Sequence, residues 1–429
     1  MARGTSADES LFPYRVLDLT DEHGQMCGKV LGDMGGDVII VEPPGGSSAR
    51  GIGPFFRDDP HPEGSLFWLA FNTSKRSITL DVVHPDGREL FLRLVETADA
   101  VVTTLHPRRL SELGLSYQEL ARRKPDIVLT TITPFGPDGP YGEYVGSDLV
   151  LQALSGFLYL SGDPDRPPTR VSVPMVATKT GAEAAAATAM ALYHRGLTGE
   201  GQQVDVSALA VAQWQLMNAA PFPRLHGTEV RRGGGYFTAL GTVKVRAIYP
   251  CKDGYVYFFF LGGTPGATSM TALTRWLDEE GTAPRLMLEK DWAGMDMGKY
   301  MYDPEAQKEV EVMETSLARF FLGKTKQQLF DRAYRERILI APVNDVRDMV
   351  EHPQPNARGF FVEVDHPELA ASFRYPGHLA LLSEGRVGVR RRAPRIGEHN
   401  REVYVEELGI SRERLAELSE AGVIGEAGT

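Results

Sequence analysis

The sequence predicts an α/β protein whose larger domain is a doubly wound parallel sheet, with helices on both faces. Two observations predict it. Short apolar runs rich in β-branched residues are typical of buried parallel strands, and helical patterns separate them. Such alternation gives a parallel sheet, because each connecting helix packs back onto the sheet. Five runs are expected as strands: residues 16–19, 38–41, 101–104, 127–131 and 204–206.

Helical patterns fill the intervals between these runs, at residues 87–96 and 117–123. A third helix is expected at 181–195, where alanine, the best helix former, predominates. So small a surface would let another backbone pack closely, although an ordinary core helix explains it equally well. Ligands of such sheets tend to bind at the carboxyl ends of the strands.

The pattern changes after Pro221 and Pro223. Residues 243–248 and 255–261 read as strands joined by a turn at Asp253 and Gly254, which predicts a β-hairpin that opens a smaller domain. The remaining segments are expected as follows: a loop-rich stretch at 278–301, a helix at 305–321, and two short amphipathic helices at 400–408 and 412–421.

Composition limits the classes of function. With 429 residues, 42% hydrophobic and 24% charged, the chain is expected to be a soluble globular protein with two domains. A net charge of -11 argues against a nucleic-acid surface. Only Cys27 and Cys251 are present, which excludes a disulfide framework and zinc-ligand spacing. No apolar run suggests a membrane span and no signal peptide is apparent, so a cytoplasmic protein is expected, with no metal site.

Short sequence blocks in a characteristic order extend over nearly the whole chain. They are found at residues 16–20, 31–45, 72–78, 80–81, 113–117, 132–140, 147–149, 152–156, 176–181, 198–202, 341–343, 357–359 and 393–400. In this order the blocks resemble the class III CoA-transferase family of CaiB/BaiF type, whose members include formyl-CoA transferase, carnitine CoA-transferase and alpha-methylacyl-CoA racemase.

The resemblance implies a Rossmann-like, CoA-binding large domain, a smaller α+β domain and an interlocked dimer. The expected division is 1–222 for the first part of the large domain, 223–335 for the small domain and 336–429 for the return, where the family blocks resume at about Ala341. It also implies that acyl-CoA and a carboxylic acid are the substrates, with no other bound cofactor.

The family's catalytic carboxylate is expected four residues before Gly181, and this chain has Ala177 there. In the family that carboxylate attacks the thioester carbonyl and forms an acyl-enzyme anhydride. Alanine has no oxygen with which to do so. The nearest acid, Glu183, would lie about 9 Å further along a helix and roughly 240° around it.

Two other residues are candidate substitutes. Lys179 could act as a base or nucleophile if its pKa were lowered, although a solvated lysine at a helix start is the simpler interpretation. Asp148 matches the acid of a Gly-His-Asp block that the resemblance connects with racemase chemistry, but Ser147 replaces the histidine. Asp148 is at least as well explained as a cap of the next helix.

The resemblance also suggests residues for CoA. They are the glycine turn at Gly24 and Gln25, whose N–H groups could face an anion, together with Arg50, Lys75 and Arg76. For each cation a solvated surface charge is the alternative. At residues 104–108 the chain departs from the family's Asn-Phe-x-Pro-Gly block, which predicts an altered nucleotide pocket.

The remaining signals are weak. His23, His106 and His226 show no metal-ligand spacing and are expected as surface or core histidines. The glycines 233–235 could form a flap over the active site or a plain linker.

Three functions follow from these observations. The first is a CoA-transferase subunit in a hetero-oligomer, whose related partner supplies the missing aspartate. The second is an acyl-CoA enzyme with rewired proton-transfer, racemase or lyase chemistry. The third is a protein that binds a CoA thioester without turning it over.

Overall fold

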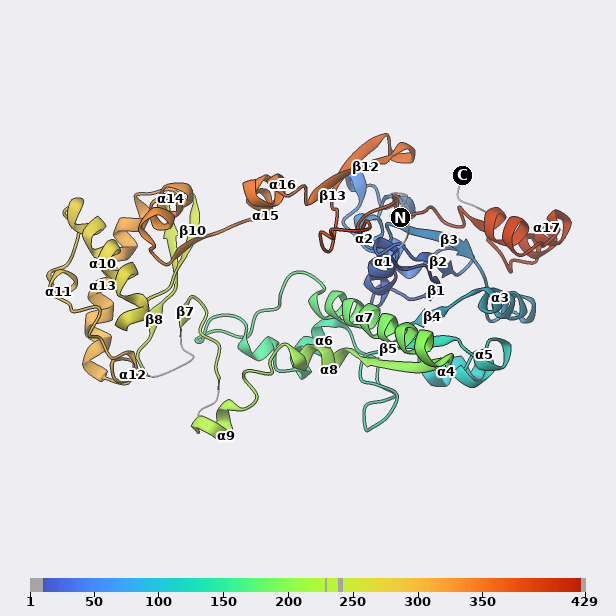
Figure 1. Cartoon of the computed structure of the whole chain (residues 1–429), viewed down its shortest axis with the longest axis horizontal. Coiled ribbons are helices and arrows are strands. Elements are labelled where there is room, and N and C mark those ends of the chain that lie inside the picture. The colour runs from blue at the N-terminus through green and yellow to red at the C-terminus, as the bar shows by residue number, and fades with distance from the viewer. Residues whose placement is uncertain (1–10, 228–229, 238–241, 426–429) are drawn as a thin grey trace, which may run out of the picture. The chain divides into compact units, whose positions relative to one another are not determined.

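The computed structural model describes residues 11–227, 230–237 and 242–425, which form two compact units (Figure 1). Unit 1 comprises the described residues of Met1–Ser155, Ser172–Leu216 and Gln354–Thr429. Unit 2 comprises those of Gly156–Val171 and Met217–Pro353.

A six-stranded, wholly parallel sheet forms the centre of unit 1, with the strand order β3-β2-β1-β4-β5-β6. The expected doubly wound α/β class is confirmed. The strands are β1 Arg15–Leu19, β2 Asp37–Glu42, β3 Lys75–Thr79, β4 Ala100–Thr103, β5 Val128–Thr133 and β6 Gln202–Ser207.

Strand β3 is not among the strands expected from the sequence. Its five residues are all buried, yet Lys75 and Arg76 begin it, so it lacks the apolar composition of its neighbours. Ion pairs with residues distant in sequence make this burial possible, because a buried charge needs a partner.

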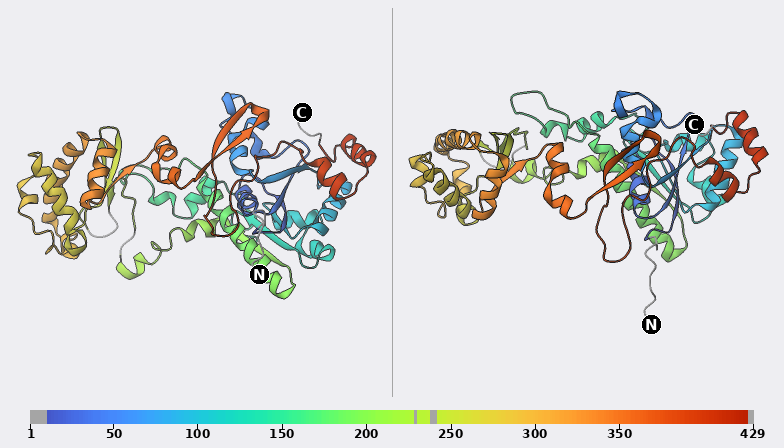
Figure 2. Two further views of the ribbon diagram at one scale, coloured as in Figure 1. Left: turned by 45° about the horizontal axis from the view of Figure 1, so that its top comes forward. Right: turned by 90° about the horizontal axis from the view of Figure 1, so that it is seen from above.

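Helices cover both faces of the sheet (Figure 2). On one face Leu17 and Ile39 pack in a core that includes side chains of α3 Pro85–Thr97 and α5 Tyr117–Arg123. On the other face Val16 and Val38, the next residues along the same strands, pack with those of α1 Gln25–Asp33 and α7 Met175–Thr198. The two-residue alternation of strand side chains thus builds two cores.

The alanine-rich helix α7 allows the close approach expected from its composition. A Cβ atom at Gly181 would lie 2.7 Å from the Cβ of Met26 and 2.9 Å from the backbone nitrogen of Cys27, both in α1. The helix begins at Met175, six residues before Gly181, and therefore includes Ala177.

Unit 2 contains a three-stranded antiparallel sheet of β9 Ile248–Cys251, β10 Gly254–Phe258 and β11 Ile340–Val343. The expected turn before β10 is confirmed, since Cys251 pairs with Gly254. The strand that precedes the turn is β9 and not residues 243–248, of which Val245 and Arg246 pair with Phe237 and Tyr236 instead. Strand β11 completes this sheet beside β10, so the chain re-enters unit 1 at Gln354 and not at about Ala341 or residue 336. The unit also takes in Gly156–Val171, inside the range 1–222 expected for the large domain.

The other strands and helices are short, with two exceptions in unit 2, α10 Gly263–Glu279 and α13 Pro304–Leu322. In unit 1 they are α2 Leu66–Phe71, α4 Pro107–Glu112, α6 Asp148–Leu154, α8 Ala208–Trp214, β12 Phe361–His366, β13 Ala371–Pro376, a π-helical turn at Glu402–Glu407 and α17 Arg412–Glu420. In unit 2 they are α9 Phe222–His226, β7 Tyr236–Phe237, β8 Val245–Arg246, α11 Arg285–Leu288, α12 Met297–Tyr300, α14 Lys326–Glu336 and α15 Val346–Glu351. Helix α16 Pro353–Ala357 begins with the last residue of unit 2 and continues into unit 1. None of the helices in the described ranges combines the length and apolar character that a membrane crossing requires.

Candidate functional site

A cavity of about 350 Å³ opens in unit 1 at the carboxyl ends of the central strands. Its wall includes Asp21 and His23, which follow β1, and Thr104 and His106, which follow β4. These two strands are neighbours where the sheet order reverses, from β1-β2-β3 on one side to β4-β5-β6 on the other. Ligands of doubly wound sheets bind at such a switch point.

Ala177 lies in the wall of this cavity. It is the third residue of α7, and its backbone N–H is one of the helix-start donors that lack a partner within the helix. Its side chain offers the cavity a methyl group only. The position that the resemblance assigns to a nucleophile therefore faces the cavity, and it carries no group that can attack a carbonyl.

Asp148 also lines the cavity, and both of its carboxylate oxygens already accept hydrogen bonds. Oδ1 accepts from the backbone N–H of Ala177 at 3.0 Å, and Oδ2 accepts from the side-chain amide of Gln152 at 2.6 Å. The cap of α6 is Ser147, whose hydroxyl accepts from the N–H of Val150. Asp148 therefore holds the start of α7, where the helix dipole favours a negative charge.

Lys179 and Glu183 pair with each other along the surface of α7, with 2.6 Å between Nζ and Oε1. Neither residue lines the cavity that contains Ala177. As expected from the helix geometry, Glu183 does not take the place of the missing carboxylate.

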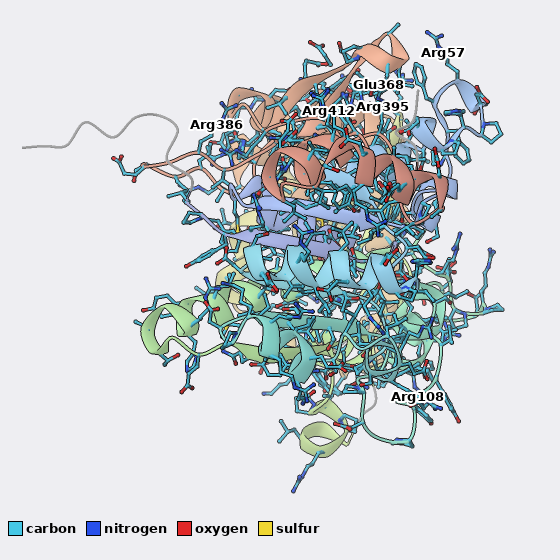
Figure 3. All side chains as sticks on the ribbon, turned by 90° about the vertical axis from the view of Figure 1, so that its right-hand side faces the viewer. Arg57, Arg108, Glu368, Arg386, Arg395 and Arg412 are labelled. Atoms are coloured by element: carbon cyan, nitrogen blue, oxygen red, sulfur yellow. The ribbon has the colours of Figure 1, made fainter. Side chains whose placement is uncertain are left out.

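The 104–108 segment contributes Thr104, His106 and Arg108 to the cavity wall. His106 accepts a hydrogen bond from the N–H of Arg108 at Nδ1, 3.2 Å away, so its Nε2 carries the proton and donates to the carbonyl of Gly142. Both ring nitrogens of His106 are thus hydrogen-bonded to backbone groups. Arg108 is well exposed beside Glu112 and Glu143, at 3.4 and 3.6 Å, and in Figure 3 it projects on the side of unit 1 opposite to Arg57.

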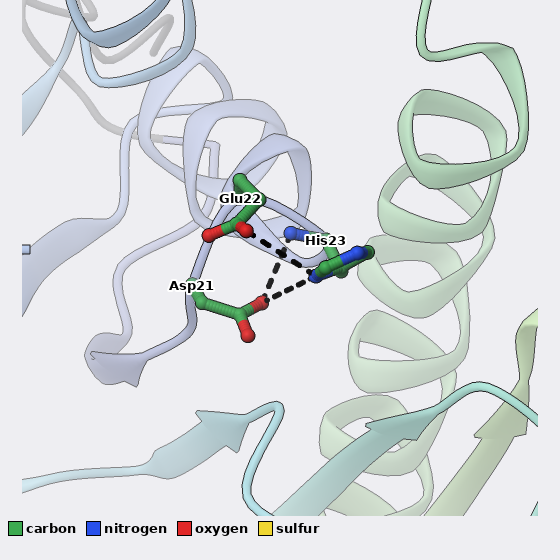
Figure 4. A group of neighbouring side chains, drawn as sticks. All are labelled: Asp21, Glu22 and His23. Carbon is green, nitrogen blue, oxygen red and sulfur yellow. Dashed lines mark hydrogen bonds and ion pairs between the residues drawn. The ribbon is translucent and has the colours of Figure 1, made fainter. Parts of the chain in front are cut away.

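His23 occupies a more specific environment than the surface or core position expected for it. Its Nδ1 lies 3.2 Å from Oδ1 of Asp21, and the ring extends from the start of α1 toward α7 (Figure 4). The backbone N–H of His23 donates to the same carboxylate oxygen of Asp21 at 3.0 Å, and the backbone N–H of Asp21 donates to the hydroxyl of Thr104. The Asp-x-His spacing directly after β1 is the signal in the sequence that could have indicated this pair.

The pKa of His23 is raised and the pKa of Asp21 is lowered. The hydrogen bond to Asp21 raises the pKa of His23, aided by the charges of Asp21, Glu22 and Asp148, although burial opposes the rise. Burial alone would raise the pKa of Asp21, but the hydrogen bonds from His23 and Thr104 and the charge of His23 lower it.

Among the described residues, Asp21, Glu22 and His23 form a group of three whose ligand atoms all lie within 4.8 Å of one another. Half-exposed acidic groups commonly show such spacing without an ion. Since Asp21 and the His23 ring already bond each other, the spacing alone assigns no metal.

The three cations suggested for CoA binding are buried in ion pairs. Arg50 pairs with Glu42 and Glu63, and Lys75 pairs with Asp18 at 2.9 Å with both side chains fully buried. Arg76 joins carboxylates of β2 and of the C-terminal π-helical turn, namely Asp37, Glu402 and Glu407. In this structure their charges stabilise the sheet, and their role toward CoA stays a prediction.

The glycine turn after β1 lies next to the cavity wall. A Cβ at Gly24 would lie 2.7 Å from a methyl carbon of Thr20 and 2.8 Å from one of Thr104, so this position requires a glycine. The side chain of Gln25 is buried and bonds Asn72. Its amide therefore belongs to the fold, while the backbone of the turn remains close to the site.

The glycines 233–235 belong to unit 2, where Gly234 adopts a φ of 58° and packs against Asp163. Their role as a flap or as a linker stays a prediction. The side chain of His226 lies outside the described part of the chain.

Comparison with known proteins agrees with this fold. The model of CoA-transferase family III matches residues 12–400. The succinyl-CoA:(R)-benzylsuccinate CoA-transferase subunit BbsE of Thauera aromatica is 36% identical over 397 residues, which cover 92% of this chain and 93% of that protein. The beta subunit of the succinyl-CoA–L-malate CoA-transferase of Chloroflexus aurantiacus is 27% identical and covers 98% of this chain and 100% of its own length.

A solved structure agrees as well. That of a CaiB/BaiF family protein from Brucella suis shares 25% of its residues with this chain, at a TM-score of 0.78 over 92% of this chain and 99% of its own. The chain belongs to CoA-transferase family III.

Proposed function

We propose that this protein is a CoA-transferase subunit that acts on acyl-CoA thioesters in a hetero-oligomer, where a related subunit supplies the catalytic aspartate. CoA moves between two carboxylic acids in the partner's active site. The single observation that carries the proposal is the methyl group of Ala177 in the wall of the switch-point cavity.

The surroundings of Ala177 favour this reading over a relocated nucleophile. An anhydride mechanism needs a carboxylate oxygen free to attack the carbonyl carbon. Asp148 is the acid bonded to Ala177, and each of its oxygens accepts a hydrogen bond, one from Ala177 and one from Gln152. Glu183 is paired with Lys179 away from the cavity. The family fold is therefore present, while the carboxylate that would react is missing at position 177.

The relatives favour a subunit role. BbsE of Thauera aromatica and the Chloroflexus beta subunit are each named as one subunit of a transferase. Their names contain succinyl-CoA as one substrate, which makes a dicarboxylic acyl group the first to test here.

One face of α7 is suited to such a partner. Met190, Tyr193 and Leu197 are 72%, 70% and 70% exposed and recur at helical spacing along one side of the helix. The opposite side of α7 packs against α1 at Gly181. A row of large exposed apolar side chains marks a protein interface, and we assign it to the related subunit in an interlocked dimer.

The test compares the purified chain alone with the chain co-expressed with a homologue from the same source that carries the aspartate. Each sample receives succinyl-CoA and a panel of carboxylic acids, and mass spectrometry follows the new thioesters. Transfer by the complex and none by the lone chain is expected. Efficient transfer by the lone chain, or no stable complex with any homologue, contradicts the proposal.

A further inference from the structure

The switch-point cavity contains a histidine that the transferase reaction does not use. His23 lines the same cavity as Ala177, and its Nδ1 is held by Asp21 at 3.2 Å. Because a carboxylate accepts from Nδ1–H, the proton lies on that nitrogen and the lone pair lies on Nε2. Nε2 makes no hydrogen bond to any residue of the described part of the chain, and this side of the ring faces α7 (Figure 4).

Several other titratable side chains of the cavity wall are held by hydrogen bonds or ion pairs. His106 has both ring nitrogens bonded to backbone groups. Asp148 has both oxygens bonded. Glu112 and Glu143 lie beside Arg108 at the exposed side of the wall. Of the two histidines in this cavity wall, His23 is therefore the one with an unbonded ring nitrogen.

The alanine at position 177 also leaves room for a reactant. An aspartate there would add a carboxyl group to the wall, whereas the methyl group leaves that volume to solvent. A water molecule needs about 30 Å³ and polar partners, and the lone pair of Nε2 is such a partner. A thioester carbonyl next to Ala177 would meet this water where the family's resemblance places its carboxylate.

We propose that the chain hydrolyses acyl-CoA thioesters at this cavity, with His23 as the general base and Asp21 as the residue that positions it. The oxygen of water bonds to the acyl carbon while Nε2 takes one of the water protons. The C–S bond then breaks, and the CoA thiolate leaves and receives that proton from His23. The products are the free carboxylic acid and CoA thiol, and no oxidant or reductant is consumed.

The charges around the ring agree with this role. Asp21, Glu22 and Asp148 are the acids whose charges raise the pKa of His23, and Asp21 also supplies the orienting hydrogen bond. Glu112, Glu143, Arg108, Arg109, His106 and Tyr144 are the other titratable or charged groups that face the cavity. A base with a raised pKa is deprotonated only at higher pH, so hydrolysis should increase as pH rises through the pKa of His23.

The inference rests on the proposed function only in placing the acyl-CoA at this cavity. Acetyl-CoA and succinyl-CoA serve as probes with the full-length chain in a buffer free of carboxylic acids, and release of CoA thiol is recorded between pH 5.5 and 9. Binding of CoA is measured in parallel by calorimetry.

Three variants separate the roles. His23→Asn keeps an N–H donor close to the Nδ1 position and removes Nε2, so hydrolysis should fall about a hundredfold while CoA binding persists. Asp21→Asn should lower the rate less and shift the midpoint of the pH profile downward, because it removes the charge that raises the pKa of His23. His84→Asn, at the N-cap of α3, is the matched control, since asparagine also caps helices well.

Hydrolysis by the lone chain that disappears in His23→Asn and survives in His84→Asn supports the inference. A chain that binds CoA but releases thiol no faster than buffer overturns it, as does an unchanged rate in His23→Asn. Absence of CoA binding also overturns it. If the chain transfers CoA with a homologue but does not hydrolyse thioesters by itself, this inference is wrong and the proposed function stands. If it hydrolyses thioesters but no complex transfers CoA, the proposed function is wrong and this inference stands.

Discussion

Restoring the family's carboxylate by Ala177→Asp tests whether a lost side chain alone accounts for the missing acyl-transfer chemistry of this chain. The new carboxylate would lie in the first turn of α7, where the helix dipole stabilises a negative charge by about 0.3–1 kcal/mol. It would also lie close to Asp148, whose Oδ1 is 3.0 Å from the nitrogen of Ala177.

The repulsion between these acids is the larger effect. Two carboxylates about 5 Å apart repel by about 3 kcal/mol at an effective dielectric constant of about 20. After subtraction of the dipole contribution, the variant should lose about 2 kcal/mol of stability at pH 8. One of the two carboxyl pKa values should rise by about 2 units, which leaves both acids ionised at that pH.

The assay is formation of an acyl-enzyme. Ala177→Asp is mixed with succinyl-CoA at pH 8, and intact-mass spectrometry looks for one added acyl group. We expect an adduct on the variant and none on the unmodified chain, with acylation at least about a hundredfold faster, equivalent to about 2.7 kcal/mol. Ala186→Asp, on an exposed position of the same helix, is the matched control. A folded Ala177→Asp that binds CoA yet forms no adduct, alone or with the homologue, refutes the reasoning.

Three further outcomes are expected. Lys75→Met should lower the free energy of unfolding in urea by about 3–5 kcal/mol, because it leaves the buried charge of Asp18 without a partner. Combining it with Asp18→Leu should recover most of that free energy. A loss of CoA affinity without this instability would instead favour a role in binding. Gly181→Ala should cost about 1–3 kcal/mol in thermal unfolding, since its Cβ overlaps α1, and an unchanged midpoint would contradict that packing. The pKa of His23 in the folded protein is raised above its ordinary 6.5, so its pair with Asp21 stabilises the fold fully below pH 6.5 and less as pH rises through the folded pKa. The stability lost in His23→Asn, measured by urea titration, should therefore shrink between pH 6 and pH 9. A difference that does not depend on pH would contradict the pairing.

Most of the sheet was predictable from local composition, because buried parallel strands are short and β-branched. Strand β3 was not, since Lys75 and Arg76 are buried through partners that lie far away in sequence, such as Asp18 and Glu402. The strand propensity of the local sequence contains no information about ion-pair partners that are distant in the chain. The return to unit 1 was placed too early for a similar reason, because β11 joins a sheet whose other strands lie about 90 residues before it.

The site divides in the same way. The position of Ala177 followed from matching sequence blocks, and the structure places it in the cavity wall. The importance of His23 could not be recognised from its surroundings in the sequence alone. It depends on the strand order that brings the ends of β1 and β4 together, and on α7 starting six residues before Gly181.

The central claim is that this chain supplies a scaffold and its partner supplies the nucleophile. The most direct measurement is peptide mapping of the carboxylates that hydroxylamine converts to hydroxamates during turnover of the assembled complex. The account predicts that every modified carboxylate belongs to the partner's peptides and that residues 172–216 of this chain stay unmodified. An adduct on an acid of this chain, formed at the rate of turnover, would contradict it.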